Sequence, residues 1–507
     1  MRRLFILCLF LVGLCFSTSA QNPIKRQIKK LNNVYSFIND NYVDDVAIEP
    51  LVEEAIRATL KELDPHSRYI TQEEMKERHN RSLGRFAGIG IQYTLHNDTI
   101  VVRKTMDNSP ASKAGIRTND RIVAIDEHSI VGDTSLNISA LLNGEAGSKV
   151  MVEVVRRGVA EHLLFTLKRD NILNSAITAA YRIDDVGYIS ISNFSRPLAA
   201  EFYSAINSLG DIRSIIIDLR DNGGGALTSA IDLSSLFLNK GDVIVTTEGR
   251  SKKVTHYKRR DDKPFDLPLI VLVNENSASA SELFAGAIQD HDRGIIVGRT
   301  TYGKGLVQRM IKLQDGSGVA ITIARYKTPS GRIIQRPYEM GKGDEYMIDS
   351  TRYLHPDSIL FSNRPVYTTL NKGRKVYGGG GITPDVYIPK REIPLSECVK
   401  EARSNNAFVH TLIDYCDVVD IYTLREQYPN FEDFEENYAI DSLAMEMFYL
   451  LANISDKDIT TSDKEYIAVM LKALIADRLY GDDAWRYIYC KHYDHMLHEA
   501  LEIATNE

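Results

Sequence analysis

The chain has 507 residues, 44% of them hydrophobic and 25% charged, a composition typical of a folded, water-soluble protein with about two to four domains. The formal net charge of −7 argues against nucleic acid as a partner. Beyond residue 20 the cysteines are Cys398, Cys416 and Cys490, so there is no disulfide framework, and at most one bridge can form between a pair that the sequence does not specify.

The first 20 residues have the three parts of a secretory signal peptide. Two arginines precede an apolar run over residues 4–16, and small residues follow it up to Ala20. The run is shorter than the ~20 residues that a membrane-spanning helix needs. We therefore expect cleavage near Gln21 and a soluble mature chain that works outside the cytoplasm, in the periplasm.

Helical periodicity dominates residues 21–83. Apolar residues recur at helical spacing from Ile24 to Tyr42, and a second helical pattern runs from Pro50 to Leu63. Thr71-Gln-Glu-Glu74 has the form of a capping box, which predicts the start of a third helix. We expect these helices to form an N-terminal scaffold.

Residues 84–170 contain short strand patterns separated by turns. Gly88-Ile-Gly-Ile91 and Ser109-Pro-Ala-Ser-Lys-Ala-Gly-Ile-Arg-Thr-Asn-Asp120 resemble a PDZ module of the bacterial protease type. Such a module pairs a peptide with a sheet edge and holds its terminal carboxylate in a loop of backbone amides. Asn119 stands where the family has glycine, a mild departure because asparagine tolerates a left-handed turn. A small β-sandwich with glycine-rich turns is the alternative. The resemblance implies that the carboxylate loop consists of Gly88, Ile89, Gly90 and Ile91.

Strand and helix patterns alternate beyond residue 180, which predicts an α/β domain. Strands are expected over Gly187–Ile191 and Ser214–Leu219, and helices over Leu198–Leu209 and Leu227–Leu238. The turn Asp218-Leu-Arg-Asp-Asn-Gly-Gly-Gly-Ala226 joins the second strand to the second helix. Glycines before a helix also suit phosphate, but the Lys-Ser/Thr of a P-loop is absent, which makes phosphate the weaker interpretation.

Ser279 lies at the next junction between a strand and a helix. The apolar run Leu269–Val273 predicts a buried strand, and small residues separate it from a helical pattern near Leu283. A hydroxyl at such an elbow is exposed, and the next amide, that of Ala280, can stabilise a developing negative charge at the helix N-terminus. Taken alone, Ser279 would more often be a helix cap.

A serine hydroxyl becomes a nucleophile when a neighbouring base removes its proton. Lys304 is the candidate base, because Gly303 and Gly305 let the backbone pack closely around it and a buried amine can lose its charge near neutral pH. Gln308, four residues further on, is placed to orient the amine by a hydrogen bond.

Other titratable side chains do not complete a triad. Asp290 is on the helix that follows Ser279, but eleven residues at ~1.5 Å rise separate the two by roughly 16 Å, so we interpret Asp290 as structural. His66, His128, His256 and His291 lie in no catalytic motif. The series His492, His495 and His498 lacks the i, i+4 spacing of a zinc pair.

The stretches Val271-Leu-Val-Asn-Glu-Asn-Ser-Ala-Ser-Ala-Ser-Glu282 and Thr301-Tyr-Gly-Lys-Gly-Leu-Val-Gln308 together resemble the motif of the carboxy-terminal (tail-specific) processing serine peptidases. In that family the second serine of the run is the nucleophile and the lysine is its base. The resemblance therefore implies that Ser279 and Lys304 form a catalytic dyad and that Gln308 completes the site.

The glycine turn at residues 218–226 is also similar to that family. It implies that one oxyanion-hole amide belongs to Gly225 or, as second choice, to Gly224, and that the other belongs to Ala280. The implied fold is an α/β catalytic domain of the crotonase/ClpP type with an inserted PDZ module and helical terminal regions. The implied reaction passes through an acyl-enzyme, acts on polypeptides recognised near their free C-termini, and needs no metal or other cofactor.

The expected domain order is a signal peptide (1–20), an N-terminal helical scaffold (21–83), a PDZ domain (84–170), a serine peptidase catalytic domain (171–390) and a C-terminal helical region (391–507). The resemblance covers about residues 30–390. A polar, tyrosine-containing insertion at 336–377 has no assigned role. In the C-terminal region, Ser462 and Glu465 have capping-box spacing, and Gly481 is expected to end that helix.

Two other functions fit parts of the sequence. A catalytically silent PDZ scaffold would not need the intact set Ser279, Lys304 and Gln308, and casein turnover separates it from a peptidase. A crotonase-like acyl transferase also pairs a Gly-Gly amide with a helix N-terminus, but a signal peptide and a PDZ module fit it poorly, and thioester hydrolysis would reveal it. A homo-oligomer is left open, and neither nucleic acid nor a membrane span is expected.

Overall fold

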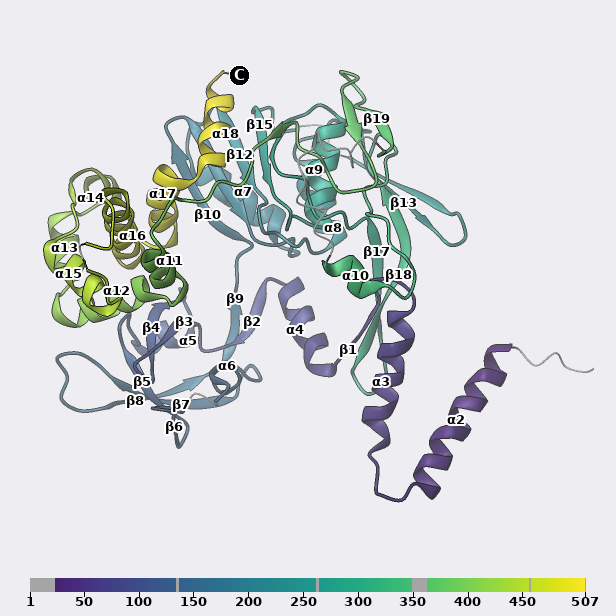
Figure 1. Ribbon diagram of the computed structural model, residues 1–507, viewed down its shortest axis with the longest axis horizontal. Coiled ribbons are helices and arrows are strands. Elements are labelled where there is room, and N and C mark those ends of the chain that lie inside the picture. Colours follow the sequence, from purple (N-terminus) through teal and green to yellow (C-terminus); the bar gives the residue numbers. More distant parts are fainter. Residues whose placement is uncertain (1–22, 134–135, 261–263, 349–362, 456, 507) are drawn as a thin grey trace, which may run out of the picture.

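The computed structural model describes residues 23–133, 136–260, 264–348, 363–455 and 457–506, which fold into four consecutive parts (Figure 1). The expected signal peptide at residues 1–20 lies outside the described residues. Within those residues, no helix combines the length and the apolar character needed to cross a membrane.

The first part is an arm of helices. It comprises α2 (Pro23–Asn41), α3 (Ile48–Lys61), β1 (Arg68–Ile70) and α4 (Gln72–Ser82). Helix α2 buries no residue, and its apolar side chains Ile28, Leu31 and Phe37 are exposed. Figure 1 shows α2 projecting away from the rest of the chain. The capping box predicted at Thr71 is confirmed, because the Thr71 side chain and the Glu74 carboxylate each accept a hydrogen bond from the other residue's amide.

The second part is a small β module. It comprises β2 (Arg85–Gly88), β3 (Ile91–His96), β4 (Thr99–Thr105), α5 (Pro110–Ala114), β5 (Arg121–Ile125), β6 (His128–Ser129), α6 (Ile138–Leu142), β7 (Lys149–Val155), β8 (Leu163–Lys168) and β9 (Asp170–Leu173). Its main sheet has the order β3-β4-β5-β7-β8, so β3 is an edge strand. Asn119 has a φ of 67°, the left-handed conformation expected of it.

The third part contains a six-stranded sheet of order β10-β11-β12-β15-β16-β21, parallel except for β10. Its elements are β10 (Ile177–Ile183), β11 (Val186–Ile191), α7 (Leu198–Ser208), β12 (Ser214–Asp218), α8 (Leu227–Ser235), β15 (Leu269–Val273), α9 (Ala280–Asp290), β16 (Ile295–Gly298) and β21 (Val386–Tyr387). The alternation of strands and helices predicted an α/β domain, and this sheet confirms it. Because parallel strands end at the same edge, the turns after β12 and β15 lie side by side.

Both faces of this sheet are covered, which explains why β12 and β15 read as continuous apolar runs. Ile215, Ile217 and Val271 point to a core shared with α7, α8 and α9. Their neighbours Ile216 and Leu272 point to the opposite core, which contains residues of the C-terminal helices. The strand that leads to Ser279 is therefore fixed from two sides.

A second, antiparallel sheet holds the Lys304 segment. It is built from β1, β13 (Val243–Gly249), β14 (Val254–Lys258), β17 (Leu306–Lys312) and β18 (Gly318–Lys327). The long strand β18 pairs with β17, β13 and β1, so it joins the N-terminal arm to the strand that begins just after Lys304. The insertion at 336–377 contributes α10 (Gly343–Ile348) and a hairpin of β19 (Val366–Thr368) and β20 (Lys375–Tyr377).

The fourth part is helical, as predicted. It comprises α11 (Glu397–Ser404), α12 (Ala407–Val418), α13 (Tyr422–Gln427), α14 (Phe431–Asn437), α15 (Ser442–Leu451), α16 (Thr461–Tyr480), α17 (Asp482–Tyr493) and α18 (His495–Asn506). The expected capping box of Ser462 and Glu465 is wrong. Helix α16 is capped two residues earlier by Thr460 and Asp463, because the buried Asp463 carboxylate also accepts the amide and hydroxyl of Ser396. Gly481 does end the helix. Cys398, Cys416 and Cys490 are all free thiols.

Candidate active site

Ser279 stands at the elbow between β15 and α9. Its backbone angles, φ 57° and ψ −107°, are rare for a residue with a Cβ atom and place strain at this position. Its amide donates to Oε2 of Glu282 at 2.8 Å, which holds the elbow in this shape. The arrangement has the form of a nucleophile elbow.

The glycine turn after β12 packs directly against the elbow. Gly224 has a φ of 94°, and a Cβ atom there would lie 2.8 Å from the Ala280 nitrogen, so glycine is required. The Gly224 amide donates to Oδ1 of Asn222 at 2.9 Å. The amides of Gly225 and Ala280 have no acceptor among the described residues. Two unengaged amides therefore lie beside Ser279, and the occupied amide of Gly224 favours Gly225 over Gly224 as the first of them.

Lys304 lies in the loop between the two sheets. Its amine donates to Oε1 of Gln308 at 3.1 Å, and the Gln308 amide group donates to the carbonyl oxygen of His66. Burial lowers the pKa of the Lys304 amine, and Arg68 lowers it further, while Glu282 and Asp64 act in the opposite direction. Both side chains are described, and no hydrogen bond joins the Lys304 amine to the Ser279 hydroxyl. In this structure the amine is therefore bonded to Gln308 and not to Ser279.

Glu282 ties the Ser279 elbow to the Lys304 loop, a role that the sequence analysis missed. The side chain is fully buried. Oε1 accepts from the Thr301 hydroxyl and the Gly303 amide, both at 2.6 Å, and Oε2 accepts from the amides of Ser279 and Lys304, both at 2.8 Å. Burial raises the pKa of the Glu282 carboxyl, although the four hydrogen bonds oppose that change.

Tyr326 of β18 makes a second bridge between the same two segments. Its buried hydroxyl lies 2.6 Å from the Lys304 carbonyl oxygen and 3.0 Å from the Ser279 carbonyl oxygen, and the two acceptors share its one proton. One hydroxyl reaches both carbonyl groups, so the two backbone segments lie close together. Position 326 gave no catalytic signal in the sequence, because its role depends on the sheet that carries it.

His66 also lies near Lys304, although it belongs to the N-terminal arm. Burial lowers the pKa of its imidazole to about 4, and the nearby Lys304 charge contributes. Its ring packs edge-on against Tyr346 of the insertion, and the Tyr346 hydroxyl lies 3.3 Å from the carbonyl oxygen of Gly303. The segment after α3 that carries His66 and the insertion therefore meet at the candidate base, a contact that separated segments of sequence could not reveal.

Asp290 lies at the far end of α9 from Ser279, as the helix length predicts. It is fully buried and forms an ion pair of 2.7 Å with Arg332, and its other oxygen accepts the Ser330 amide at 2.9 Å. These contacts support its interpretation as structural.

The expected carboxylate loop connects β2 to β3 in the β module. Residues Gly88 and Ile91 are strand ends, and the amides of Ile89 and Gly90 have no acceptor among the described residues. The loop is held by the Ala111 amide, which donates to the Ile89 carbonyl oxygen at 2.9 Å. The hydroxyls of Tyr93 on β3 and Ser139 on α6 lie 3.0 Å apart, a hydrogen bond that joins the edge strand to this helix.

In chemical terms, the site combines a half-buried serine on a strained elbow, a lysine amine with a lowered pKa and two unengaged amides. Such a set can perform acyl transfer, because the amine can take the hydroxyl proton and the amides can hold an oxyanion.

Three family descriptions match the chain. Residues 185–341 match peptidase family S41, residues 87–167 match the PDZ domain, and residues 15–74 match the N-terminal domain of the activating protease CtpB. These matches end before the C-terminal helical region.

Named relatives show similarity over most of their own length. A carboxy-terminal-processing protease of Bartonella bacilliformis is 35% identical over 338 residues, covering 64% of this chain and 77% of the relative. The carboxy-terminal processing protease CtpA of Bacillus subtilis is 34% identical over 310 residues, covering 61% of this chain and 66% of the relative. Among solved structures, a photosystem II D1 C-terminal processing protease is 26% identical, covering 70% of this chain and 85% of its own, with a TM-score of 0.37.

Proposed function

This chain belongs to the carboxy-terminal-processing serine peptidases, and from that premise we propose that it is a secreted endopeptidase with Ser279 as nucleophile and Lys304 as general base. The observation that carries the proposal is the buried Lys304 amine, with its lowered pKa, in a loop that Glu282 joins to the Ser279 elbow. A neutral amine can accept a proton, whereas an ammonium cannot.

The proposed reaction has two halves. Neutral Lys304 turns from Gln308 and takes the Ser279 proton while Oγ attacks the scissile carbonyl carbon, and the oxyanion is held by the amides of Gly225 and Ala280. Collapse of this intermediate breaks the C–N bond, and the Lys304 ammonium gives its proton to the leaving amine. Water then attacks the acyl-enzyme, with Lys304 again accepting and returning the proton.

The test is mass spectrometry of the fragments of a denatured substrate protein after incubation with the wild type and with Ser279→Ala. We expect internal cleavage by the wild type alone, with early cuts near the C-terminus. Equal fragments from both proteins would reject Ser279 as nucleophile, and no fragments from the wild type would favour the silent PDZ scaffold.

Activity should rise with pH as the Lys304 ammonium loses its proton, at a pH below the usual ~10.4 of lysine. Arg68, whose positive charge disfavours the ammonium, supplies a test. In Arg68→Gln the Lys304 pKa rises, so the rising limb of kcat/KM should move to higher pH, and by less at high salt. Arg309→Gln, a change of equal charge on exposed β17, is the control. A downward shift in Arg68→Gln, or an equal shift in the control, would refute the assignment.

The β module is proposed to bind substrate C-termini through the amides of the 88–91 loop, with the peptide paired to edge strand β3. The unengaged amides of Ile89 and Gly90 support this role. Amidation of the peptide removes its terminal charge. Binding of an amidated peptide to full-length Ser279→Ala should therefore be weaker than that of the matched free acid by about 1.5–3 kcal/mol, or roughly 10- to 150-fold. Equal affinities in a calorimetric titration would remove tail recognition from the proposal.

The proposal extends to domain order, location and assembly. We assign residues 84–170 to the PDZ domain and 171–390 to a catalytic domain of the crotonase/ClpP type. N-terminal sequencing after expression would test signal cleavage near Gln21 and export to the periplasm.

We also propose that a second copy of the chain covers the apolar face of α2. The basic residues of α2 in one copy would face the acidic residues of α3 in the other, and sedimentation of the full chain would test this assembly.

A further inference from the structure

The C-terminal helices α17 and α18 close the back of the sheet that carries Ser279. Met496, Leu497 and Ala500 pack with Ile216 and Leu272 in one buried cluster. Figure 1 shows the two helices, coloured yellow, lying against the strands of this sheet. The three family matches end at residue 341, so this layer is not part of what they describe.

Asp494, between α17 and α18, reaches across this interface to the glycine turn. Its two carboxylate oxygens accept from Nη1 and Nη2 of Arg220 at 2.8 and 2.6 Å, a forked ion pair. The same guanidinium donates to Asp218, the last residue of β12, at 2.6 Å. The Arg220 and Asp494 side chains are 19% and 9% exposed, so water screens the pair only weakly.

Arg220 lies where the glycine turn leaves the sheet. The next residue, Asp221, has a φ of 59°. Asn222 is fully buried, donates to the Ile191 carbonyl oxygen at 2.8 Å and accepts the Gly224 amide. The carbonyl oxygen of Asn222 in turn accepts the Ala278 amide at 3.0 Å. Only residues 221–224 separate Arg220 from Gly225, and the hydrogen bonds of Asn222 hold them in place. A displacement of Arg220 would therefore also displace the Gly225 amide.

We propose that Asp494 is a positioning residue for peptide hydrolysis, because its ion pair with Arg220 fixes the turn that presents the Gly225 amide to the oxyanion. This inference rests on the proposed function. An oxyanion-hole donor contributes about 10²–10³ to kcat, and a donor moved out of place loses part of that. The substrate ground state does not depend on this amide to the same degree, so kcat should fall while KM stays nearly constant.

Asp494 also supports α18, and the test must separate the two roles. Its Oδ1 accepts the Leu497 amide at 3.0 Å, the position of a helix cap. Asparagine caps helices as well as aspartate does, but it carries no charge and turns an amide group toward Arg220. Asp494→Asn therefore keeps the cap and removes the ion pair.

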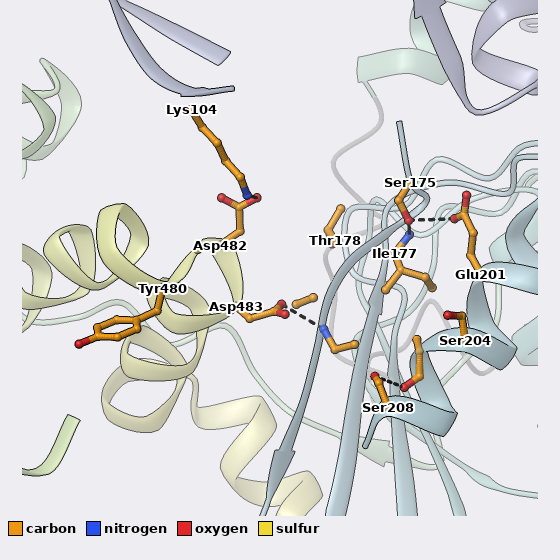
Figure 2. A pocket seen from close by; sticks show the side chains of 14 residues that line it. Lys104, Ser175, Ile177, Thr178, Glu201, Ser204, Ser208, Tyr480, Asp482 and Asp483 are labelled. Atoms are coloured by element: carbon orange, nitrogen blue, oxygen red, sulfur yellow. Dashed lines mark hydrogen bonds and ion pairs between the residues drawn. The ribbon is translucent and has the colours of Figure 1, made fainter. Parts of the chain in front are cut away.

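Asp483 supplies a matched control in the same layer. Figure 2 shows it at the start of α17, at a cavity of about 500 Å³ between the sheet edge and the C-terminal helices. It accepts the Ala180 amide of β10 at 3.1 Å, and its neighbour Asp482 pairs with Lys104 of the β module at 3.3 Å. Asp483→Asn thus weakens a contact between the C-terminal helices and the sheet without touching the glycine turn.

The experiment measures kcat and KM on one fluorogenic peptide, together with thermal unfolding, for full-length proteins. The wild type is compared with Asp494→Asn, Asp483→Asn, Arg220→Lys, Arg220→Gln and the double variant Arg220→Gln/Asp494→Asn. We expect Asp494→Asn to lower kcat roughly 10-fold with KM within twofold, and Asp483→Asn to keep the wild-type kcat. Arg220→Lys, which keeps the charge but loses the fork, should also lower kcat, and it replaces Asp494→Asn if that protein does not fold. The double variant should be no slower than Arg220→Gln, because the pair acts as one unit.

A wild-type kcat in folded Asp494→Asn, or an equal loss in Asp483→Asn, would overturn the positioning role. Failure of the proposed function gives a different pattern, in which the wild type does not cleave or Ser279→Ala cleaves equally.

Discussion

Ser279→Ala is expected to reduce peptide cleavage by about 10⁶-fold while leaving the protein folded, because it removes the only atom that forms the acyl bond in the proposed reaction. Alanine keeps the Cβ atom, so the strained backbone at φ 57° is unchanged. Hydrolysis of a fluorogenic peptide, alongside circular dichroism and thermal unfolding, measures both parts of the result.

Lys304→Ala should be nearly as damaging, with a loss of about 10⁴-fold or more in kcat. The variant should unfold at the same temperature as the wild type or higher. Burying the lysine amine costs free energy because the amine loses its hydration, and alanine has no such cost. Asp290→Asn provides the contrast, since it should act through stability by breaking the buried pair with Arg332. Substantial turnover by a folded Lys304→Ala protein would contradict the dyad.

Replacement of Glu282 is expected to give the next largest effect. In Glu282→Gln one oxygen becomes an amide group, so either the pair Thr301 and Gly303 or the pair Ser279 and Lys304 loses its acceptor. Two donors left without acceptors in a fully buried site should lower stability by about 3 kcal/mol or more. The Ser279 elbow and the Lys304 loop then move apart, and a displacement of about 1 Å can reduce kcat roughly 100-fold.

Glu275→Gln is the matched control for that change. Glu275 lies in the loop between β15 and α9, but it pairs with Arg299 at 2.7 Å and contacts neither Ser279 nor Lys304 among the described interactions. We expect kcat to stay within about twofold of the wild type, the size of effect expected from a change away from the site. Chemical denaturation and steady-state kinetics are measured on both variants. Equal losses of stability and of kcat in Glu275→Gln and Glu282→Gln would disprove the role of Glu282.

Local sequence patterns predicted the parts of the site that local forces determine. The strand Leu269–Val273 has the predicted bounds, because a strand buried on both faces must be apolar throughout. The hydrogen bond from Lys304 to Gln308 was also predictable, since the two residues are four apart in one segment.

Contacts between distant segments were not predictable. Ser279 and Glu282 have capping-box spacing, but three of the four donors to Glu282 come from residues 301–304, which no spacing rule connects to the helix. His66 likewise reaches Gln308 only through the folded arm.

The start of α16 shows how a local signal can be placed two residues away from the true start of a helix. Thr460 with Asp463 and Ser462 with Glu465 fit the same pattern, and the sequence alone gives no reason to prefer either. The contact between Asp463 and Ser396 decides in favour of the first pair. The C-terminal helices were predicted as helices, but the sheet face that they cover follows only from the tertiary structure.

Labelling with a fluorophosphonate probe tests the central assignment most directly. The probe forms a covalent bond to an activated serine oxygen and releases fluoride, so peptide mapping identifies the nucleophile. We expect a single adduct on Ser279 in the wild type, with the rate of labelling rising with pH, and almost none in Lys304→Ala. An adduct on another serine, or equal labelling of the wild type and Lys304→Ala, would contradict the proposed Ser279 and Lys304 mechanism.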